Sequence, residues 1–182
     1  MPFQYSLFPE KDEKKDKEIL IVDIETTGFL RQNGVIVEIG IVKLNLNSGK
    51  TTPVFNSLVK EPSFGPSHNK PPLGWIFNNS TLNYSDVEKA PLLSSVFHDI
   101  QTVLKEENDG LTAYNAAFDL PFLKSRSFSF NPLPCPMLAA TPVVNLPPAG
   151  GRKDPKWPSV EEAWHFFFPD SPYQEQHRAL DD

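Results

Sequence analysis

The chain has 182 residues and a formal net charge of −6 at pH 7, with 17 Lys and Arg against 23 Asp and Glu. Apolar residues make up 39% of the sequence and charged residues 22%, which is typical of a globular domain and excludes a disordered chain. The acidic balance argues against a protein held on nucleic acid by net charge alone. A single cysteine, Cys135, excludes an internal disulfide and a zinc site built from several cysteines.

The N-terminal part of the sequence differs from the rest. Residues 1–9 contain several apolar side chains, and residues 10–18 are a run of five acids and four lysines. We interpret residues 1–18 as a peptide with a charged linker and residues 19–182 as one folded domain. The start of the chain lacks the basic-then-apolar pattern of a signal peptide, and no apolar run approaches the ~18 residues of a membrane span. We therefore expect a cytoplasmic protein with no membrane partner.

Three apolar, β-branched runs predict strands at residues 19–25, 35–44 and 53–60. The short connections between them favour an antiparallel meander. A short apolar segment at residues 111–114 predicts a further buried strand. Glu38 interrupts the second run, so we expect this carboxylate to have a structural partner.

Helices are predicted in the second half of the chain. Ser85 and Glu88 have the spacing of a capping box, which predicts a helix start there. The apolar residues between Leu93 and Leu104 follow helical spacing and predict an amphipathic helix. Residues 61–72, with four prolines, predict a loop.

The last third of the chain combines a proline-rich stretch with a helix. Residues 131–158 contain eight prolines and predict a long irregular connection. Ser159 and Glu162 form a second capping-box spacing, and the helix that follows is expected to end before Pro169. The element order predicts an α/β fold with a mixed sheet and helices on its faces.

Two carboxylates lie in the first predicted strand. Asp23 and Glu25 are two residues apart, so their side chains share one face of the strand while Ile24 points the other way. Burying two unpaired carboxylates is costly, and a hard divalent cation would remove that cost. The alternative interpretation is that the strand ends here and both acids reach water. Thr26-Thr27-Gly28 follows directly, a tight turn that offers hydroxyl and N–H groups to a ligand.

Three segments carry a family resemblance. Residues 23–28, D-I-E-T-T-G, resemble the first motif of the DEDDh (DnaQ-like) 3′→5′ exonucleases, which include the proofreading epsilon subunit of bacterial DNA polymerase III and ribonuclease T. Residues 114–119, Y-N-A-A-F-D, are similar to the second motif, and residues 177–182, H-R-A-L-D-D, resemble the third. The three segments occur in the family's order, so we interpret the chain as a member.

The resemblance implies a ribonuclease-H-like fold, with a mixed five-stranded sheet flanked by helices, and a set of catalytic roles. It implies that Asp23, Glu25, Asp119 and Asp182 hold two divalent metal ions, Mg²⁺ or Mn²⁺. It implies that His177 is the general base, for which an imidazole is well suited at neutral pH.

The sequence departs from the family pattern in three places. Residue 182 ends the sequence, whereas family members continue through a closing helix. Tyr114 stands where the family has histidine. Pro121 follows Asp119 by two residues, so we expect the helix of the second motif to begin late, near Phe118 or Asp119, or to be irregular. Residues five apart on a helix lie ~140° apart, so His177 is expected to precede a helix that carries Asp182.

Several residues are candidates for contact with substrate. Thr26, Thr27 and Gly28 offer backbone and hydroxyl groups, and the resemblance implies that Phe29 packs against the 3′-terminal bases. Phe29 could instead be an edge of the core. Phe77 lies in a segment similar to one that touches bases in ribonuclease T.

Two further segments are weaker candidates for nucleic-acid contact. The amide of Asn115 is expected to bind a phosphate or a nucleotide. Residues 151–157 combine three basic residues with Trp157, which suits a single strand, although a solvated loop is the favoured interpretation.

A possible partner site lies in the N-terminal peptide. Residues 4–8, Q-Y-S-L-F, resemble the short peptide by which bacterial replication and repair proteins bind the sliding clamp. Gln4, Leu7 and Phe8 would carry that contact, with Leu7 and Phe8 filling an apolar pocket. The alternative is that both side chains pack on the domain itself.

The sequence therefore predicts a metal-dependent 3′→5′ exonuclease that releases 5′-mononucleotides from single-stranded DNA 3′ ends. An RNA-trimming enzyme similar to ribonuclease T is the first alternative, and DNA is favoured over RNA because of the clamp-like peptide. The second alternative is an accessory module bound to a clamp or polymerase.

Overall fold

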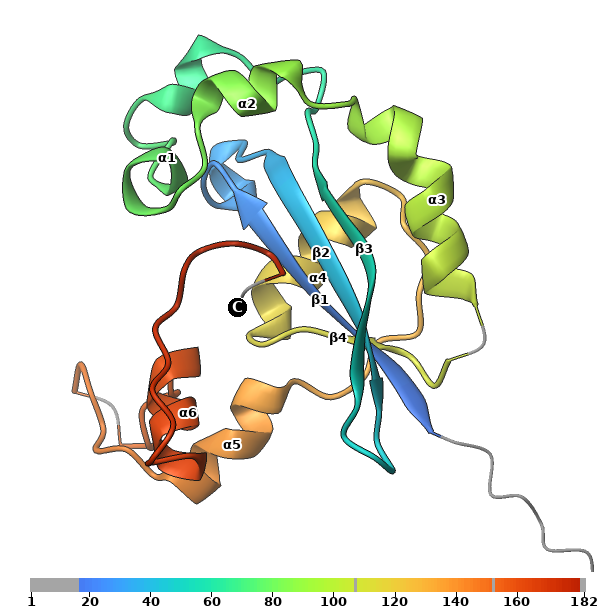
Figure 1. The fold of residues 1–182 in the computed structure, drawn as a ribbon. Coiled ribbons are helices and arrows are strands. Elements are labelled where there is room, and N and C mark those ends of the chain that lie inside the picture. Colours follow the sequence, from blue (N-terminus) through green and yellow to red (C-terminus); the bar gives the residue numbers. More distant parts are fainter. Residues whose placement is uncertain (1–16, 107, 152, 181–182) are drawn as a thin grey trace, which may run out of the picture.

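The computed structural model describes residues 17–106, 108–151 and 153–180 and shows one mixed sheet with helices around it (Figure 1). The strands are β1 (Glu18–Thr26), β2 (Ile36–Asn45), β3 (Thr51–Leu58) and β4 (Leu111–Thr112), in the spatial order β3-β2-β1-β4. β1, β2 and β3 pair antiparallel, and β4 pairs parallel with β1. The predicted meander and the short buried strand after it are confirmed.

The prediction of five strands is wrong for the part of the chain that the structure describes, where the sheet has four. The next segment makes only an isolated parallel bridge, Leu111 with Pro132. It is held by two hydrogen bonds of 2.8 Å, from Leu111 N–H to Asn131 O and from Leu133 N–H to Leu111 O. In this register Leu133 donates toward β4, so Pro132 and Pro134 lack an N–H on the side that faces away from β4.

The helical segments alternate with strands and loops from residue 30 onward. The described helices are η1 (Leu30–Gln32), η2 (Pro66–Asn69), α1 (Ile76–Asn79), α2 (Tyr84–Lys89), α3 (Leu93–Lys105), α4 (Ala116–Ser125), α5 (Pro136–Val144) and α6 (Val160–Phe167). α3 confirms the amphipathic prediction. At α6 the predicted capping box is formed, because Glu162 N–H donates to Ser159 Oγ and Ser159 N–H donates to the Glu162 carboxylate.

Three helix predictions need correction. α2 begins at Tyr84 after Asn83, so Ser85 lies inside the helix and does not cap it. Residues 136–144, expected to be irregular, form α5, because Pro136 occupies the first helical turn, where a missing N–H has no cost. Residues 61–72 are mainly loop but contain the short helix η2.

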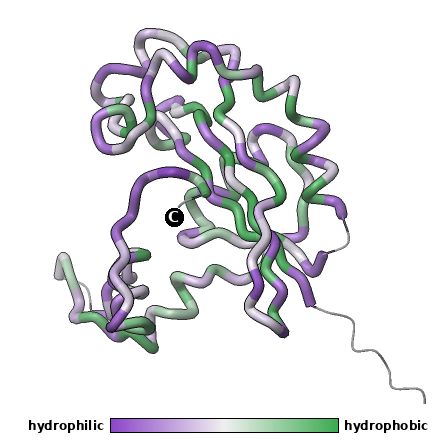
Figure 2. Tube along the Cα trace, in the orientation of Figure 1, coloured by the Kyte–Doolittle hydropathy of each residue, from purple (hydrophilic) through white to green (hydrophobic). Residues whose placement is uncertain are grey.

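The main core fills one face of the sheet. Alternate β1 residues, Leu20, Val22 and Ile24, are at most 3% exposed and pack with side chains from α3 and α4. In Figure 2 apolar stretches run along the central strands, whereas the segment after α6 is largely hydrophilic. The other face of β1 therefore presents the side chains of Asp23 and Glu25. No described helix is long and apolar enough to cross a membrane.

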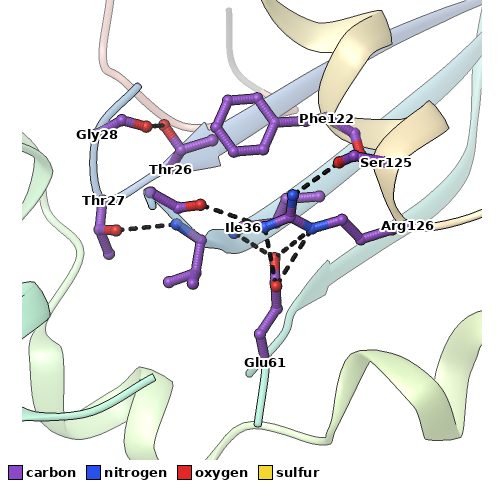
Figure 3. Close-up of polar contacts among 10 residues, drawn as sticks. Thr26, Thr27, Gly28, Ile36, Glu61, Phe122, Ser125 and Arg126 are labelled. Atoms are coloured by element: carbon purple, nitrogen blue, oxygen red, sulfur yellow. Dashed lines mark hydrogen bonds and ion pairs between the residues drawn. The ribbon is translucent and has the colours of Figure 1, made fainter. Parts of the chain in front are cut away.

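A polar cluster joins the end of α4 to the start of β2 (Figure 3). The carboxylate of Glu61 accepts hydrogen bonds from Arg126 Nε and Nη2 and from Ile36 N–H, at 2.8 to 3.2 Å. Arg126 also donates to Gly34 O at 3.2 Å and to Ser125 Oγ at 2.7 Å. This bidentate pair, which is mostly buried, links the C-terminal end of α4, away from its first turn, to the start of β2.

Candidate active site

The first motif lies at the end of β1 and faces a cleft of about 860 Å³. Asp23 and Glu25 line this cleft, and Ile24 between them is 3% exposed in the core. The alternation of side chains predicted for this strand is therefore confirmed. In the pairing with β2, Asp23 lies opposite Gly40 and Glu25 lies opposite Glu38, which places these four residues on the same face of the sheet.

The second motif brings a third carboxylate into the cleft. β4 is only two residues long, so it stops pairing with β1 before Ile24. Asp119 of α4 takes the place of a strand there, and its Oδ1 accepts a hydrogen bond from Ile24 N–H at 3.2 Å. Asp119 is 2% exposed. Burial raises the pKa of its carboxyl group well above the usual value, and the nearby charge of Asp23 raises it further.

Helix α4 starts earlier than predicted. Asn115 adopts the left-handed conformation (φ 59°), which Asn tolerates better than most residues, and the helix begins at the next residue. Its first turn is irregular as expected, because Phe118 N–H donates to Asn115 O, only three residues back, at 2.8 Å. Pro121 lies inside the helix. The early start is what places Asp119 in the first turn, facing β1.

The third motif is only partly within the described residues. His177 lines the cleft, has a positive φ of 53° and lies outside the described helices. The helix predicted to carry Asp182 stays a prediction. The ring of Trp75 meets the imidazole edge-on, with centroids 5.0 Å apart, and Nδ1 lies 3.7 Å from Glu175 Oε1. Asp182 lies outside the described residues, and so do Gln4, Leu7 and Phe8, so these assignments stay predictions.

The turn after β1 is held mainly by its own hydrogen bonds. Thr27 is 1% exposed; its Oγ1 accepts from Val35 N–H at 3.1 Å, and its carbonyl accepts from Gly74 N–H at 2.7 Å. Thr26 Oγ1 donates to Gly28 O at 3.0 Å. A Cβ on Gly28 would lie 2.5 Å from a methyl group of Leu73. All three turn residues line the cleft.

Three exposed aromatic residues border the cleft. Phe29, Trp75 and Trp157 line it and are each more than half exposed. Sequence reasoning selected Phe29 and not Trp75, although the two aromatic residues Trp75 and Phe77 are neighbours on the same short segment. The structure places Phe77 away from the cleft lining, in a second core cluster where it packs edge-on against Phe64 and Tyr84.

The donor set suits a hard cation, although the described residues do not complete a metal site. Among residues 17–106, 108–151 and 153–180, no three His, Cys, Asp or Glu side chains are arranged to hold a metal ion. The described carboxylates nevertheless offer oxygen donors, and the Asp23 charge disfavours ionisation of the buried Asp119. A divalent cation would relieve that repulsion, so the residues present fit such an ion.

The arrangement matches a known family along most of the chain. Residues 20–182 match the exonuclease family. The chain belongs to the DEDDh exonucleases. The family comprises 3′→5′ exonucleases, which are hydrolases, and its members generally use two divalent metal ions.

Two curated relatives of this DEDDh exonuclease are bacterial polymerases. A DNA polymerase III PolC-type of Clostridium perfringens is 34% identical over 113 residues, which cover 62% of this chain and 7% of the polymerase. A DNA polymerase III PolC-type of Caldanaerobacter subterraneus subsp. tengcongensis is 31% identical over 118 residues, covering 65% of this chain and 8% of the polymerase. The DEDDh exonuclease thus spans less than a tenth of the length of these relatives.

One solved structure shares the fold over most of the chain. The crystal structure of cell-death related nuclease 4 superposes with a TM-score of 0.58 and 14% sequence identity, over 92% of this chain and 60% of that one. At this identity the likeness supports the ribonuclease-H-like fold and nothing finer.

Proposed function

We propose that this exonuclease removes nucleotides from the 3′ ends of single-stranded DNA and releases 5′-mononucleotides. The observation that carries the proposal is the convergence of Asp23, Glu25, Asp119 and His177 on one cleft bordered by exposed aromatic rings. Carboxylates suit a cation-assisted attack on a phosphodiester, and the imidazole suits transfer of the proton. The rings suit stacking on bases of any sequence.

Each residue of the candidate site would have a distinct role in this reaction. The carboxylates of Asp23, Glu25 and Asp119, with Asp182, would hold two divalent cations. When bound, these would lower the pKa of the attacking water and stabilise the leaving 3′ oxygen. His177 would accept the proton of that water through its imidazole. Ile24 N–H holds the Asp119 carboxylate in place, so one ligand of the site is oriented by backbone alone.

DNA is the proposed substrate for two reasons. Two relatives at 34% and 31% identity are DNA polymerases, and this chain matches one segment of each. The ribonuclease-T-like alternative depended partly on Phe77, which packs in the second core cluster instead of lining the cleft. RNA trimming is kept as an outcome of the experiment.

The experiment is digestion of matched 5′-labelled single-stranded DNA and RNA with Mg²⁺, Mn²⁺ or EDTA. The variants are Asp23→Asn and His177→Gln. The exposed pair on α3, Asp99→Asn and His98→Gln, provides matched controls with the same chemical changes away from the cleft.

A ladder that shortens from the 3′ end, needs metal and disappears in both cleft variants but in neither control supports the proposal. We expect a loss of about 10²-fold or more in kcat for each cleft variant. A faster rate on RNA than on DNA would reassign the substrate. Activity that survives both cleft variants would overturn the proposed site.

A further inference from the structure

A second bidentate glutamate–arginine pair lies beside the candidate base. Arg178 follows His177 directly, and its guanidinium donates to both carboxylate oxygens of Glu38, with Nη2 2.7 Å from Oε1 and Nε 3.0 Å from Oε2. Ala179 N–H donates to the same carboxylate at 3.2 Å, and Arg178 Nη1 donates to Thr81 Oγ1 at 3.1 Å. Glu38 is 2% exposed, so the pair is shielded from solvent on the carboxylate side.

The strand beneath this pair is shaped to receive the segment. Two residues after Glu38, a Cβ added to Gly40 would lie 2.1 Å from the carbonyl oxygen of Ala179. The backbone of Ala179 therefore rests directly on β2 at a position where any side chain would displace it. Glycine in a strand interior usually weakens the strand, and close approach of another backbone is the reason that this position requires it.

The strand register connects this anchor to the site. Glu38 lies opposite Glu25, and Gly40 lies opposite Asp23. Residues 178 and 179 are thus attached to β2 next to the two β1 carboxylates, on the same face of the sheet. Figure 1 shows the segment after α6 crossing back to the strands.

We propose that Glu38 is a positioning residue of the reaction and that, together with Gly40, it fixes the segment that carries His177. The proposal rests on the proposed role of His177 as the base. Glu38 touches no reacting atom. Its carboxylate holds the backbone on the C-terminal side of the imidazole, and the ring of Trp75 supports the imidazole itself. A displacement of ~1 Å at a catalytic group is enough to lower a rate about 10²-fold.

The chain contains a matched control for this idea. Glu61 accepts a bidentate arginine and one backbone N–H, as Glu38 does, but its partners are Arg126 and Ile36 and not the segment at 177–180. Glu38→Gln and Glu61→Gln therefore remove the same charge from the same type of cluster. The full-length chain is used for both, with kcat, KM and melting temperature measured on single-stranded DNA.

We expect Glu38→Gln to lower kcat about 10²-fold with KM within about threefold, because a base is displaced and binding groups are kept. Glu61→Gln should keep kcat within about threefold at a comparable loss of melting temperature. Arg178→Gln should match Glu38→Gln, and the double variant should lose no more than either single one. The proposal would be overturned if Glu38→Gln and Glu61→Gln had equal kcat values. It would also be overturned if the losses of kcat followed the losses of melting temperature.

A second measurement separates this inference from the proposed function. Hydrogen exchange at the amide of Ala179 reports the anchor without any substrate, and we expect it to quicken at least about tenfold in Glu38→Gln and not in Glu61→Gln. Exchange that is unchanged in both would overturn the inference. Wild-type protein without nuclease activity but with the expected exchange would overturn the proposed function alone. If Glu38→Gln fails to fold, Arg178→Lys, which keeps the charge and loses the bidentate fork, is judged by the same criteria.

Discussion

Asp119 shows how a functional residue can oppose the stability of its own fold. Its carboxyl is buried beside Asp23, and its pKa is raised in the folded state. A group of this kind contributes stability below its unfolded pKa of ~3.9, and the contribution is lost as pH rises through the folded pKa. At neutral pH, which lies above the unfolded pKa, the buried Asp119 therefore lowers the free energy of unfolding of the metal-free protein.

We predict that Asp119→Asn is more stable than the wild type in EDTA at neutral pH, by about 1 kcal/mol, and inactive as a nuclease. The amide oxygen can still accept from Ile24 N–H. The stability difference should shrink as pH falls toward 4, because the wild-type carboxyl is then protonated. Urea unfolding of both proteins across this pH range measures it. Mg²⁺ should stabilise the wild type and not the variant. A variant less stable than the wild type at every pH would contradict the prediction.

Two neighbouring aromatic residues have opposite expected roles. Trp75 is exposed at the cleft and contacts His177, whereas Phe77 packs in the second core cluster. We expect Trp75→Leu to lower kcat/KM about 10-fold or more with little change in melting temperature, because a stacking surface worth ~1–3 kcal/mol is lost. Phe77→Leu should lower unfolding free energy by ~1–3 kcal/mol and keep kcat/KM. Steady-state kinetics with thermal unfolding distinguishes them, and a reversed pattern would show that Phe77 binds substrate.

At the scale of elements, one tyrosine links two parts of the chain. Tyr114, which stands where the family has histidine, directs its hydroxyl to Pro158 O and Ser159 O at 2.9 and 3.1 Å. Burial raises the pKa of this hydroxyl to about 12, with smaller contributions from Cys135 and two glutamates. The bond ties the segment between β4 and α4 to the first turn of α6.

We predict that Tyr114→Phe lowers the free energy of unfolding by ~1 kcal/mol at pH 7. The raised pKa means that the wild type loses its advantage as pH rises from ~10 to 12, because the unfolded tyrosine ionises first. Unfolding curves of both proteins at pH 7 and in this alkaline range measure the difference. If the difference in free energy of unfolding between the two proteins stays constant up to pH 12, the Tyr114 hydroxyl is neither buried nor hydrogen-bonded as described.

Short-range sequence patterns predicted the elements whose formation depends on residues close together in the chain. The β-branched runs predicted the meander, and the Ser159–Glu162 box predicted the start of α6, because side-chain periodicity and capping are encoded within a few positions. α5 was missed because its two prolines resemble loop residues, although one occupies the permitted first turn. The fifth strand was expected from the family, and the described segment at residues 131–133 forms only one bridge with β4.

The candidate site was predictable where a motif placed residues on one element. Strand alternation placed Asp23 and Glu25 on one face, and the motif of residues 23–28 identified them as site residues. The identity of the Glu38 partner could not be predicted, because Arg178 is 140 positions away and only the fold brings the two together. Trp75 was also missed, because nothing in the residue spacing distinguishes it from Phe77.

At the scale of the whole molecule, the N-terminal peptide poses a separate question. Residues 4–8 lie outside the described part of the chain, so attachment to a sliding clamp stays a prediction. We expect Leu7→Ala with Phe8→Ala to abolish binding to a bacterial sliding clamp and to leave the rate on free DNA unchanged. Calorimetric titration with the clamp and digestion of unbound DNA measure the two effects. A lower melting temperature with no clamp binding in either protein would show instead that the peptide packs on the domain.

The prolines beside the sheet have a consequence for how the protein behaves in concentrated solution. β3 forms one outer edge and contains Pro53, and Pro132 and Pro134 follow the other edge beyond β4. An exposed strand edge is a template on which a second molecule can add its own strand, and proline interrupts the row of donors that this addition requires. Prolines thus lie beside both margins of the sheet, where they oppose edge-to-edge aggregation.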